Sequence, residues 1–281
     1  MGKKSWADFE LYVITGENNH PGKQLADVME QALAGGADIL QLRNKTGSKA
    51  ELLEQGKMLR ELTAAYGVPF IVNDHPDLAI ELSADGVHLG QEDMPIAEAR
   101  RLLGNDRIIG ISTHSLEQAL AAERDGADYI GVGPVYPTNT KPGRPAVTTN
   151  FVADAARHVA IPFVAIGGIT LGNVDEVLNA GASRICAVSA IVGSESPDEA
   201  CRYFLDKINA AKALQPIALT VNGRQERLPV QTLEGLVLRL GQRHKRCVAE
   251  VDGELIPYGK WKHTELRDGM TVELVHFVGG G

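Results

Sequence analysis

Short apolar runs rich in Val and Ile alternate with longer amphipathic stretches over the first 210 residues of the chain. This alternation is typical of successive β/α units that build a parallel sheet. Eight runs are predicted as strands: Glu10–Thr15, Ile39–Asn44, Phe70–Asp74, Gly86–Gly90, Ile108–Thr113, Tyr129–Val135, Phe163–Ile169 and Arg184–Ile191. Eight strands close the commonest parallel barrel, whereas open doubly wound sheets usually have about five to seven. We therefore predict an α/β fold of the (β/α)8 TIM-barrel type.

Four turns that precede strands share a pattern: Gly36-Ala37-Asp38, Ser83-Ala84-Asp85, Gly126-Ala127-Asp128 and Gly181-Ala182-Ser183. Each turn follows a stretch with helical character. Glycine suits the left-handed residue that ends a helix, and alanine lets the next strand pack closely. Such recurrence is expected of a barrel built from like units.

The chain changes character after a helix predicted over Pro197–Lys212, with Ser196 as its cap and proline at its first position. Residues 214–216 are predicted as a linker between a barrel domain, residues 1–213, and a second domain, residues 217–281. The second domain is predicted to contain strands and a helix in the order Ile217–Val221, Glu226–Val230, helix Thr232–Leu240, Cys247–Val251 and Thr271–Val278, with a hairpin at Asn222-Gly223. Two strands, a helix and two more strands indicate a small α+β fold of the β-grasp, ubiquitin-like kind.

The composition is that of a folded chain, with 44% hydrophobic and 23% charged residues. Residues 217–281 hold nine Lys/Arg and eight Asp/Glu, which leaves 19 against 28 in residues 1–216. The excess of acidic residues in residues 1–216 does not suit general nucleic-acid binding, and binding of an anionic substrate would need local cations or a metal ion.

Three widely separated cysteines suggest reduced thiols rather than disulfides or a zinc site. No apolar run approaches the roughly 18 residues of a membrane span. The N-terminus also lacks the apolar segment of a secretory signal. We expect a cytoplasmic protein with no nucleic-acid or membrane partner.

Catalytic groups in β/α barrels come from the carboxyl ends of the strands. The second predicted strand ends in Gln41-Leu42-Arg43-Asn44-Lys45. Alternation along a strand points Gln41, Arg43 and Lys45 the same way, which gathers two cations and an amide. These groups suit a phosphate-type anion, and a solvated charged loop is the alternative.

Two carboxylates follow the next two strands. Asp74 comes directly after Asn73, and Asp93 follows the fourth strand in Gly90-Gln91-Glu92-Asp93. Carboxylate oxygens are the ligands that Mg²⁺ prefers, and the metal would draw a diphosphate leaving group away. The alternative is that each aspartate caps the helix that follows it.

Hydroxyls and backbone N–H groups are available at the remaining strand ends. Ser112 lies near the end of the fifth strand, and the loop after the sixth contains Thr138, Asn139, Thr140 and Lys141 among prolines that restrict it. Gly168 follows the seventh strand, and Val188 and Ser189 lie near the end of the eighth. The last two strand ends form the usual barrel phosphate site.

Five motifs carry a family resemblance: Gln41-Leu42-Arg43-Asn44-Lys45, Val72-Asn73-Asp74, Gly86-Val87-His88-Leu89-Gly90-Gln91-Glu92-Asp93, Gly131-Val132-Gly133-Pro134-Val135-Tyr136-Pro137-Thr138-Asn139-Thr140-Lys141 and Ala165-Ile166-Gly167-Gly168-Ile169. In this order they resemble the thiamine phosphate synthase family over about residues 10–210. The resemblance implies an alkyl transferase that joins hydroxymethylpyrimidine diphosphate to hydroxyethylthiazole phosphate, giving thiamine phosphate and diphosphate. It also implies Mg²⁺ as cofactor.

The same resemblance implies roles for individual residues. The pyrimidine diphosphate is expected to contact Gln41, Arg43, Lys45, Asn73, Ser112 and Lys141, with Mg²⁺ on Asp74 and Asp93. The thiazole phosphate is expected to contact Thr138, Thr140, Gly168, Val188 and Ser189, and Asn44 and Asn139 complete the substrate-binding set. Arg43, Ser112 and Lys141 are the expected catalytic residues. His88 is expected to pack or to form hydrogen bonds rather than to act as a general base.

The chain ends in a predicted strand that runs into Gly279, Gly280 and Gly281. A glycine tail can thread a narrow channel and expose its carboxylate for activation, whereas the alternative is a frayed end or a cloning remnant. With the β-grasp pattern before it, residues 217–281 resemble the ubiquitin-like sulfur carrier of thiazole formation. That family implies adenylation of the last glycine by a partner enzyme, conversion to a thiocarboxylate and sulfur delivery to thiazole synthase.

Two other functions remain open from the sequence. Another phosphate-binding barrel enzyme, such as an isomerase, would share the last two strand ends and would lack metal dependence. A catalytically silent barrel could serve as a scaffold for the carrier. The oligomeric state, a homo-oligomer included, is also left open.

Overall fold

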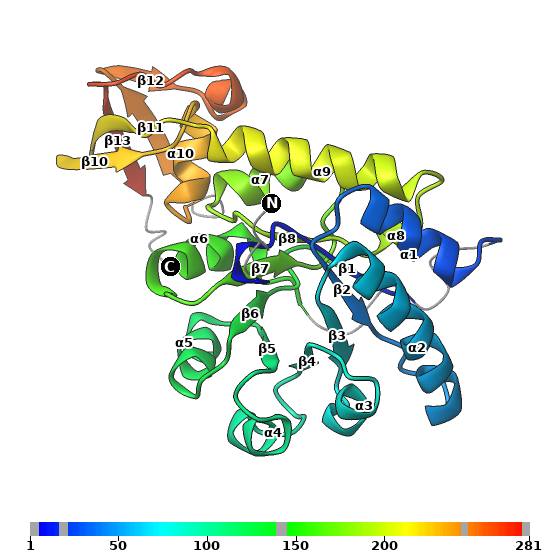
Figure 1. Ribbon diagram of the computed structural model, residues 1–281. Coiled ribbons are helices and arrows are strands. Elements are labelled where there is room, and N and C mark those ends of the chain that lie inside the picture. The colour runs from blue at the N-terminus through cyan, green and yellow to red at the C-terminus, as the bar shows by residue number, and fades with distance from the viewer. Residues whose placement is uncertain (1–5, 17–21, 139–144, 243–246, 277–281) are drawn as a thin grey trace.

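Eight parallel strands close into a barrel in chain order, which confirms the predicted fold (Figure 1). The structure, a computed structural model, describes residues 6–16, 22–138, 145–242 and 247–276. The barrel strands are β1 (Leu11–Ile14), β2 (Ile39–Leu42), β3 (Phe70–Asn73), β4 (Gly86–Leu89), β5 (Ile108–Thr113), β6 (Tyr129–Val132), β7 (Phe163–Ile166) and β8 (Ile185–Cys186).

Helices surround the barrel and bury its outer face. They are α1 (Leu25–Ala34), α2 (Lys49–Tyr66), α3 (Pro76–Glu81), α4 (Ile96–Leu103), α5 (Leu116–Arg124), α6 (Thr148–His158), α7 (Val174–Asn179), α8 (Ser189–Val192) and α9 (Pro197–Lys212), after a short 3-10 helix η1 (Trp6–Asp8). One apolar cluster lies between strands and helices, and a second fills the barrel interior with Phe9, Tyr12, Tyr129 and aliphatic side chains. None of the described helices is long and apolar enough to cross a lipid bilayer.

The prediction for the eighth strand was wrong beyond its first residues. The run predicted as Arg184–Ile191 is divided into the two-residue strand β8 and the helix α8, with Val188 at the helix N-cap. Ile191 and Val192 are fully buried although they are helical. A short apolar run is compatible with a buried strand or a buried helix, so periodicity alone does not separate the two.

Aspartates in three of the recurring turns each accept a hydrogen bond from a backbone N–H of the preceding strand. Asp85 Oδ2 accepts from Phe70 N at 2.7 Å, and Asp128 Oδ2 accepts from Ile109 N at 2.7 Å. Asp38 Oδ2 accepts from Leu11 N at 3.1 Å. The backbone N–H of each aspartate donates in return to the carbonyl of the same strand residue at 2.8 Å. The repeated Asp therefore ties the amino-terminal ends of neighbouring strands together.

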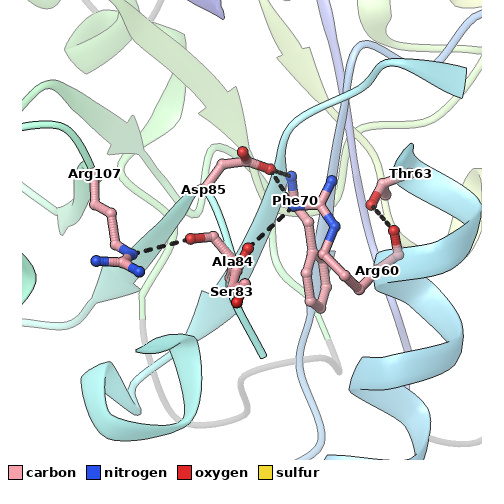
Figure 2. Close-up of polar contacts among 7 residues, drawn as sticks. All are labelled: Arg60, Thr63, Phe70, Ser83, Ala84, Asp85 and Arg107. Carbon is pink, nitrogen blue, oxygen red and sulfur yellow. Dashed lines mark hydrogen bonds and ion pairs between the residues drawn. The ribbon is translucent and has the colours of Figure 1, made fainter. Parts of the chain in front are cut away.

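Figure 2 shows Asp85 and its hydrogen-bond partners at the turn between α3 and β4. Arg60 of α2 donates to Asp85 Oδ2 at 2.7 Å and to the Ser83 carbonyl at 3.3 Å, and its guanidinium lies over the Phe70 ring. Arg107 Nε donates to the Ala84 carbonyl at 3.2 Å from the other side. Two arginines thus hold the turn at the end of the barrel opposite the carboxyl ends of the strands.

The C-terminal domain is a five-stranded mixed sheet that packs on one helix. Its strand order is β10-β9-β13-β11-β12. The elements are β9 (Ile217–Val221), β10 (Arg224–Leu228), α10 (Leu233–Arg239), β11 (Cys247–Val251), β12 (Glu254–Ile256), the 3-10 helix η2 (Tyr258–His263) and β13 (Thr271–His276). The domain boundary predicted at residues 214–216 lies between α9 and β9.

Two details of this domain differ from the prediction. The second strand is Arg224–Leu228 rather than Glu226–Val230, because the two-residue Asn222-Gly223 turn pairs Arg224 directly with Val221. The strand β12 was not predicted, and it forms a hairpin with β11 across the Asp252-Gly253 turn.

Helix α10 joins the two domains by packing on α6 and α7 of the barrel (Figure 1). Arg157 Nη2 of α6 donates to the backbone carbonyl of Arg239. A Cβ atom at Gly181 would lie 2.9 Å from Arg239 Nη1, so glycine leaves room for that guanidinium. Burial, followed by the nearby charge of Arg157, lowers the pKa of Arg239. The carrier-like domain is therefore docked on the barrel through its helix.

Candidate active site

A pocket with about 910 Å³ of empty volume, part of it open to solvent, lies at the carboxyl ends of the barrel strands. Eight of the predicted site residues line it: Gln41, Arg43, Asn73, Ser112, Thr138, Gly168, Val188 and Ser189. They come from separate strand ends that are distant in sequence. Barrel closure alone brings them together.

Four predicted residues are not among the described residues that line this pocket. Asn44 accepts from the backbone N–H of Gly47 at 2.8 Å and shapes the loop after β2. Lys45, Asp74 and Asp93 also lie outside the lining set. Asn139, Thr140 and Lys141, and at the tail Gly280 and Gly281, lie outside the described residues.

Arg43 is held in place through its backbone by a buried threonine. Thr15 Oγ1 donates to the Arg43 carbonyl at 2.9 Å and accepts from Arg43 N at 2.8 Å, and Thr15 is 3% exposed. These two hydrogen bonds join the ends of β1 and β2, and the Arg43 side chain lies at the pocket wall. A preorganised guanidinium loses little conformational freedom when it binds a phosphate.

An ion pair connects the neighbouring strand ends of β2 and β3. Lys45 Nζ lies 2.5 Å from Asp74 Oδ2. Asp74 has φ 64°, in the left-handed region, and its N–H donates to the His88 carbonyl at 2.9 Å. Non-glycine residues in this region are uncommon and cluster at functional sites.

Asp74 and Asp93 fit a divalent metal by their chemistry. Neither caps the helix that follows, because the N-cap residues of α3 and α4 are His75 and Pro95, without a side-chain cap. Asp93 Oδ2 accepts from Gly90 N at 2.6 Å. Within the described chain no group of three or more His, Cys, Asp or Glu could hold a metal by itself. Two carboxylates suit Mg²⁺, which usually takes its other ligands from water and substrate phosphates.

The opposite wall of the pocket is backbone from the last two strand ends. Gly167 and Gly168 have φ 98° and 66°. A Cβ atom at Gly168 would lie 2.7 Å from the Pro137 carbonyl, so the two loops pack at a distance that only glycine permits. Ser189 begins α8, where the first N–H groups of a helix have no intrahelical acceptor. This wall can donate hydrogen bonds to a phosphate.

Residues that sequence reasoning did not assign to the site lie beneath and beside this pocket. Tyr12 and His114 line it, and His114 Nδ1 lies 2.5 Å from the Gly133 carbonyl. His88 is a hydrogen-bond partner, as expected: its Nδ1 lies 2.9 Å from Tyr129 Oη and its Nε2 lies 2.9 Å from Ser112 Oγ. The two tyrosines sit in apolar strand runs, so their sequence context indicates only core packing.

A parallel barrel with an arginine, amides and a hydroxyl at one side of its mouth, and glycine-rich backbone at the other, defines an enzyme for phosphorylated small molecules. Comparison with known proteins makes the class specific. The family model described as thiamine monophosphate synthase matches residues 11–191, and the ThiS family model matches residues 219–281. The chain belongs to the thiamine monophosphate synthase family, with a ThiS-type module at its C-terminus.

Individual relatives agree with this family. The chain is 53% identical over 204 residues to thiamine-phosphate synthase of Shouchella clausii, covering 72% of this chain and 98% of that protein. It is 52% identical over 198 residues to the Halalkalibacterium halodurans protein of the same name, covering 70% and 94%. The solved structure of thiamine phosphate pyrophosphorylase from Pyrococcus furiosus superposes with a TM-score of 0.67 at 39% identity, covering 73% of this chain and 98% of that one. A 3-hexulose-6-phosphate synthase, at 20% identity and a TM-score of 0.52, shares the fold alone.

Proposed function

We propose that the barrel joins hydroxymethylpyrimidine diphosphate to hydroxyethylthiazole phosphate, forming thiamine phosphate and releasing diphosphate. The observation that carries the proposal is the two-sided pocket. Gln41, Arg43, Asn73 and Ser112 form one wall, and the backbone of Gly168 and Ser189 contributes to the other. Two walls of different chemistry suit two phosphorylated substrates that must meet between them.

The reaction transfers an alkyl group and needs no proton transfer or redox change. The carbon–oxygen bond between the pyrimidine methylene and the diphosphate breaks, and its electron pair leaves with the diphosphate. The thiazole nitrogen then supplies the pair for the new carbon–nitrogen bond. Arg43 and Lys45, with Lys141 from the loop after β6, would stabilise the charge on the departing diphosphate. Ser112 would hold the pyrimidine, and the three expected catalytic residues remain Arg43, Ser112 and Lys141.

Asp74 and Asp93 would hold Mg²⁺ at the diphosphate side of the pocket. Bound there, the metal would neutralise negative charge on the leaving group. Lys45, which pairs with Asp74, would keep one cation beside these carboxylates in the absence of substrate. Asn44, Asn139, Thr138 and Thr140 remain proposed substrate contacts.

The test is formation of thiamine phosphate from the two phosphorylated heterocycles by the full chain, with and without Mg²⁺. Wild-type turnover should depend on Mg²⁺, and Arg43→Ala should lower kcat/KM roughly 100-fold with the fold intact. Arg124→Ala, which changes an exposed arginine of α5, is the matched control and should keep wild-type turnover. No product from the wild-type chain would favour a silent scaffold. Metal-independent conversion of a different phosphorylated substrate would favour another barrel enzyme.

For the C-terminal domain we propose a sulfur carrier that is adenylated at Gly281 by an activating adenylyltransferase and then converted to a thiocarboxylate for thiazole synthase. The ThiS family match over residues 219–281 supports this role. The test incubates the full chain with an activating enzyme, ATP and a sulfur source, and measures the intact mass. Replacement of one carboxylate oxygen by sulfur is expected. A variant truncated before Gly280 should show no change, and an unchanged wild-type mass would indicate a tail that has lost its function.

A further inference from the structure

Five polar side chains from five different strands form a continuous hydrogen-bonded chain through the barrel interior. Gln41 Nε2 donates to Tyr12 Oη at 2.7 Å, and Tyr12 Oη lies 2.8 Å from Tyr129 Oη. Tyr129 Oη lies 2.9 Å from His88 Nδ1, and His88 Nε2 lies 2.9 Å from Ser112 Oγ. The two end members, Gln41 and Ser112, line the pocket on the side of the predicted pyrimidine diphosphate site.

One direction of donation lets every member of this hydrogen-bonded chain donate to the next. An amide nitrogen can only donate, so Tyr12 accepts from Gln41, and in this direction the Tyr12 proton is donated to Tyr129. In the same direction Tyr129 donates to His88 Nδ1, and this arrangement has the ring proton on Nε2. That proton is donated to Ser112 Oγ, so the serine hydroxyl can donate into the pocket and the Gln41 carbonyl oxygen can accept there.

Both tyrosines are buried and neutral, so each hydroxyl can donate one hydrogen bond. Tyr12 is 2% and Tyr129 0% exposed, and burial raises the pKa of both phenols well above their ordinary value. Each hydroxyl therefore keeps its single proton. Gly110 of β5 provides the space for Tyr129, because a Cβ atom there would lie 2.1 Å from the ring carbon Cζ and 2.5 Å from Oη.

Tyr129 is separated from the substrate by the other members of the chain. Tyr12, Gln41, His88 and Ser112 line the pocket, whereas Tyr129 is not among the described residues that do so. Its hydroxyl lies within hydrogen-bond distance of both Tyr12 and His88. Removal of the Tyr129 hydroxyl can therefore affect the pocket only by changing the hydrogen bonds of Tyr12 and His88.

We propose that Tyr129 is a positioning residue, and that the chain Gln41–Tyr12–Tyr129–His88–Ser112 sets the pocket to present one acceptor, Gln41 Oε1, and one donor, the Ser112 hydroxyl. This inference rests on the proposed function in that the paired acceptor and donor select the heterocycle of the diphosphate substrate. A ring that offers a donor beside an acceptor is bound, and a ring with these groups exchanged is rejected.

The experiment replaces Tyr129 by Phe, which keeps the ring and removes only the hydroxyl. We expect kcat/KM for the pyrimidine diphosphate to fall roughly tenfold or more, with KM for the thiazole phosphate unchanged. Thr63→Val is the matched control, since it removes a buried hydroxyl of α2 that bonds only the Arg60 carbonyl among its described partners, and it should leave both constants unchanged. The proposal would be overturned if KM for the thiazole phosphate rose by as large a factor as kcat/KM for the pyrimidine diphosphate fell. It would also be overturned if neither constant changed.

A second readout does not depend on turnover and so separates this inference from the proposed function. The ¹⁵N shifts of the His88 ring in the full chain should identify the Nε2–H tautomer, and Tyr129→Phe should shift the Nδ1 signal. An Nδ1–H tautomer in the wild type would reverse the bonds between Tyr129, His88 and Ser112 and overturn the proposal, whatever the enzyme produces. If the expected tautomer is found but no thiamine phosphate is formed, the proposed function fails and the proposed arrangement of hydrogen bonds stands.

Discussion

Asp128 offers the sharpest test of how the barrel is held together. Its Oδ2 accepts from the backbone N–H of Ile109 at 2.7 Å and from Arg100 Nη2 at 2.6 Å. Ile109 is fully buried, so Asp128→Ala leaves its N–H without this acceptor, which costs about 1–3 kcal/mol. The ion pair adds little, under about 1 kcal/mol, because its side chains are 22% and 30% exposed and Arg100 keeps a bond to the Arg107 carbonyl.

We therefore expect Asp128→Ala to lower the free energy of unfolding by about 2–3 kcal/mol. Asp128→Asn retains an acceptor oxygen and should lose only about 1 kcal/mol. The measurement is urea denaturation of the full chain followed by far-UV circular dichroism. Asp125→Ala, at an exposed position in the same turn, is the control and should stay within about 0.5 kcal/mol of wild type.

The reasoning is refuted by an alanine variant as stable as wild type, or by an asparagine variant that loses as much as alanine. The first result would show that the Ile109 N–H is not dependent on this acceptor. The second would show that charge, rather than the hydrogen bond, matters at Asp128. Turnover per folded molecule should be unchanged in all three variants, because this turn lies at the barrel end opposite the pocket.

Three further predictions concern the metal, the domain contact and the thiols. Asp74→Asn and Asp93→Asn should each raise the Mg²⁺ concentration for half-maximal turnover by about tenfold or more, measured by titration after chelation. Arg239→Ala should speed amide hydrogen exchange in α10 while the sheet of the C-terminal domain stays protected, because the variant loses the guanidinium that packs against Gly181 of the barrel but keeps the carbonyl that accepts from Arg157. Burial raises the pKa of the Cys201 thiol to about 12, so the reactive thiolate is scarce near neutral pH; mass spectrometry after alkylation should find partly exposed Cys247 modified first.

Much of the barrel could be predicted because its strands are apolar on both faces and are bounded by turn residues. The pattern of apolar residues was misleading at Ile191, which is buried in a helix but belongs to a run predicted as strand. It also failed to indicate β12, where Glu254 and Leu255 are exposed and three residues are too few to show an alternation. The aspartates of the turns were recognised as a repeat, but their hydrogen bonds depend on a strand some twenty residues away.

The candidate site divides in the same way. Arg43, Asn73 and Ser112 could be predicted because they lie at or directly after the carboxyl ends of strands, and all carboxyl ends of a parallel barrel share one mouth. The hydrogen-bonded series through Tyr12 and Tyr129 could not be predicted, because the two residues lie on opposite walls of the barrel and are 117 positions apart in the sequence. Each tyrosine alone fits a buried apolar strand, and only closure of the barrel brings their hydroxyls together.

The docking of α10 on α6 and α7 has a consequence for supply within the cell. A carrier made as a separate chain is present at a concentration set by its own expression, and it diffuses away from the enzyme that uses the product of its sulfur. In the joined and docked chain the ratio of carrier to barrel is always one to one, and dilution does not separate them. An enzyme that engaged the tail to build a thiazole, as proposed above, would bring a barrel close to its product. Under that proposal the linkage of the two domains, rather than the abundance of either, would govern how soon the product meets its next active site.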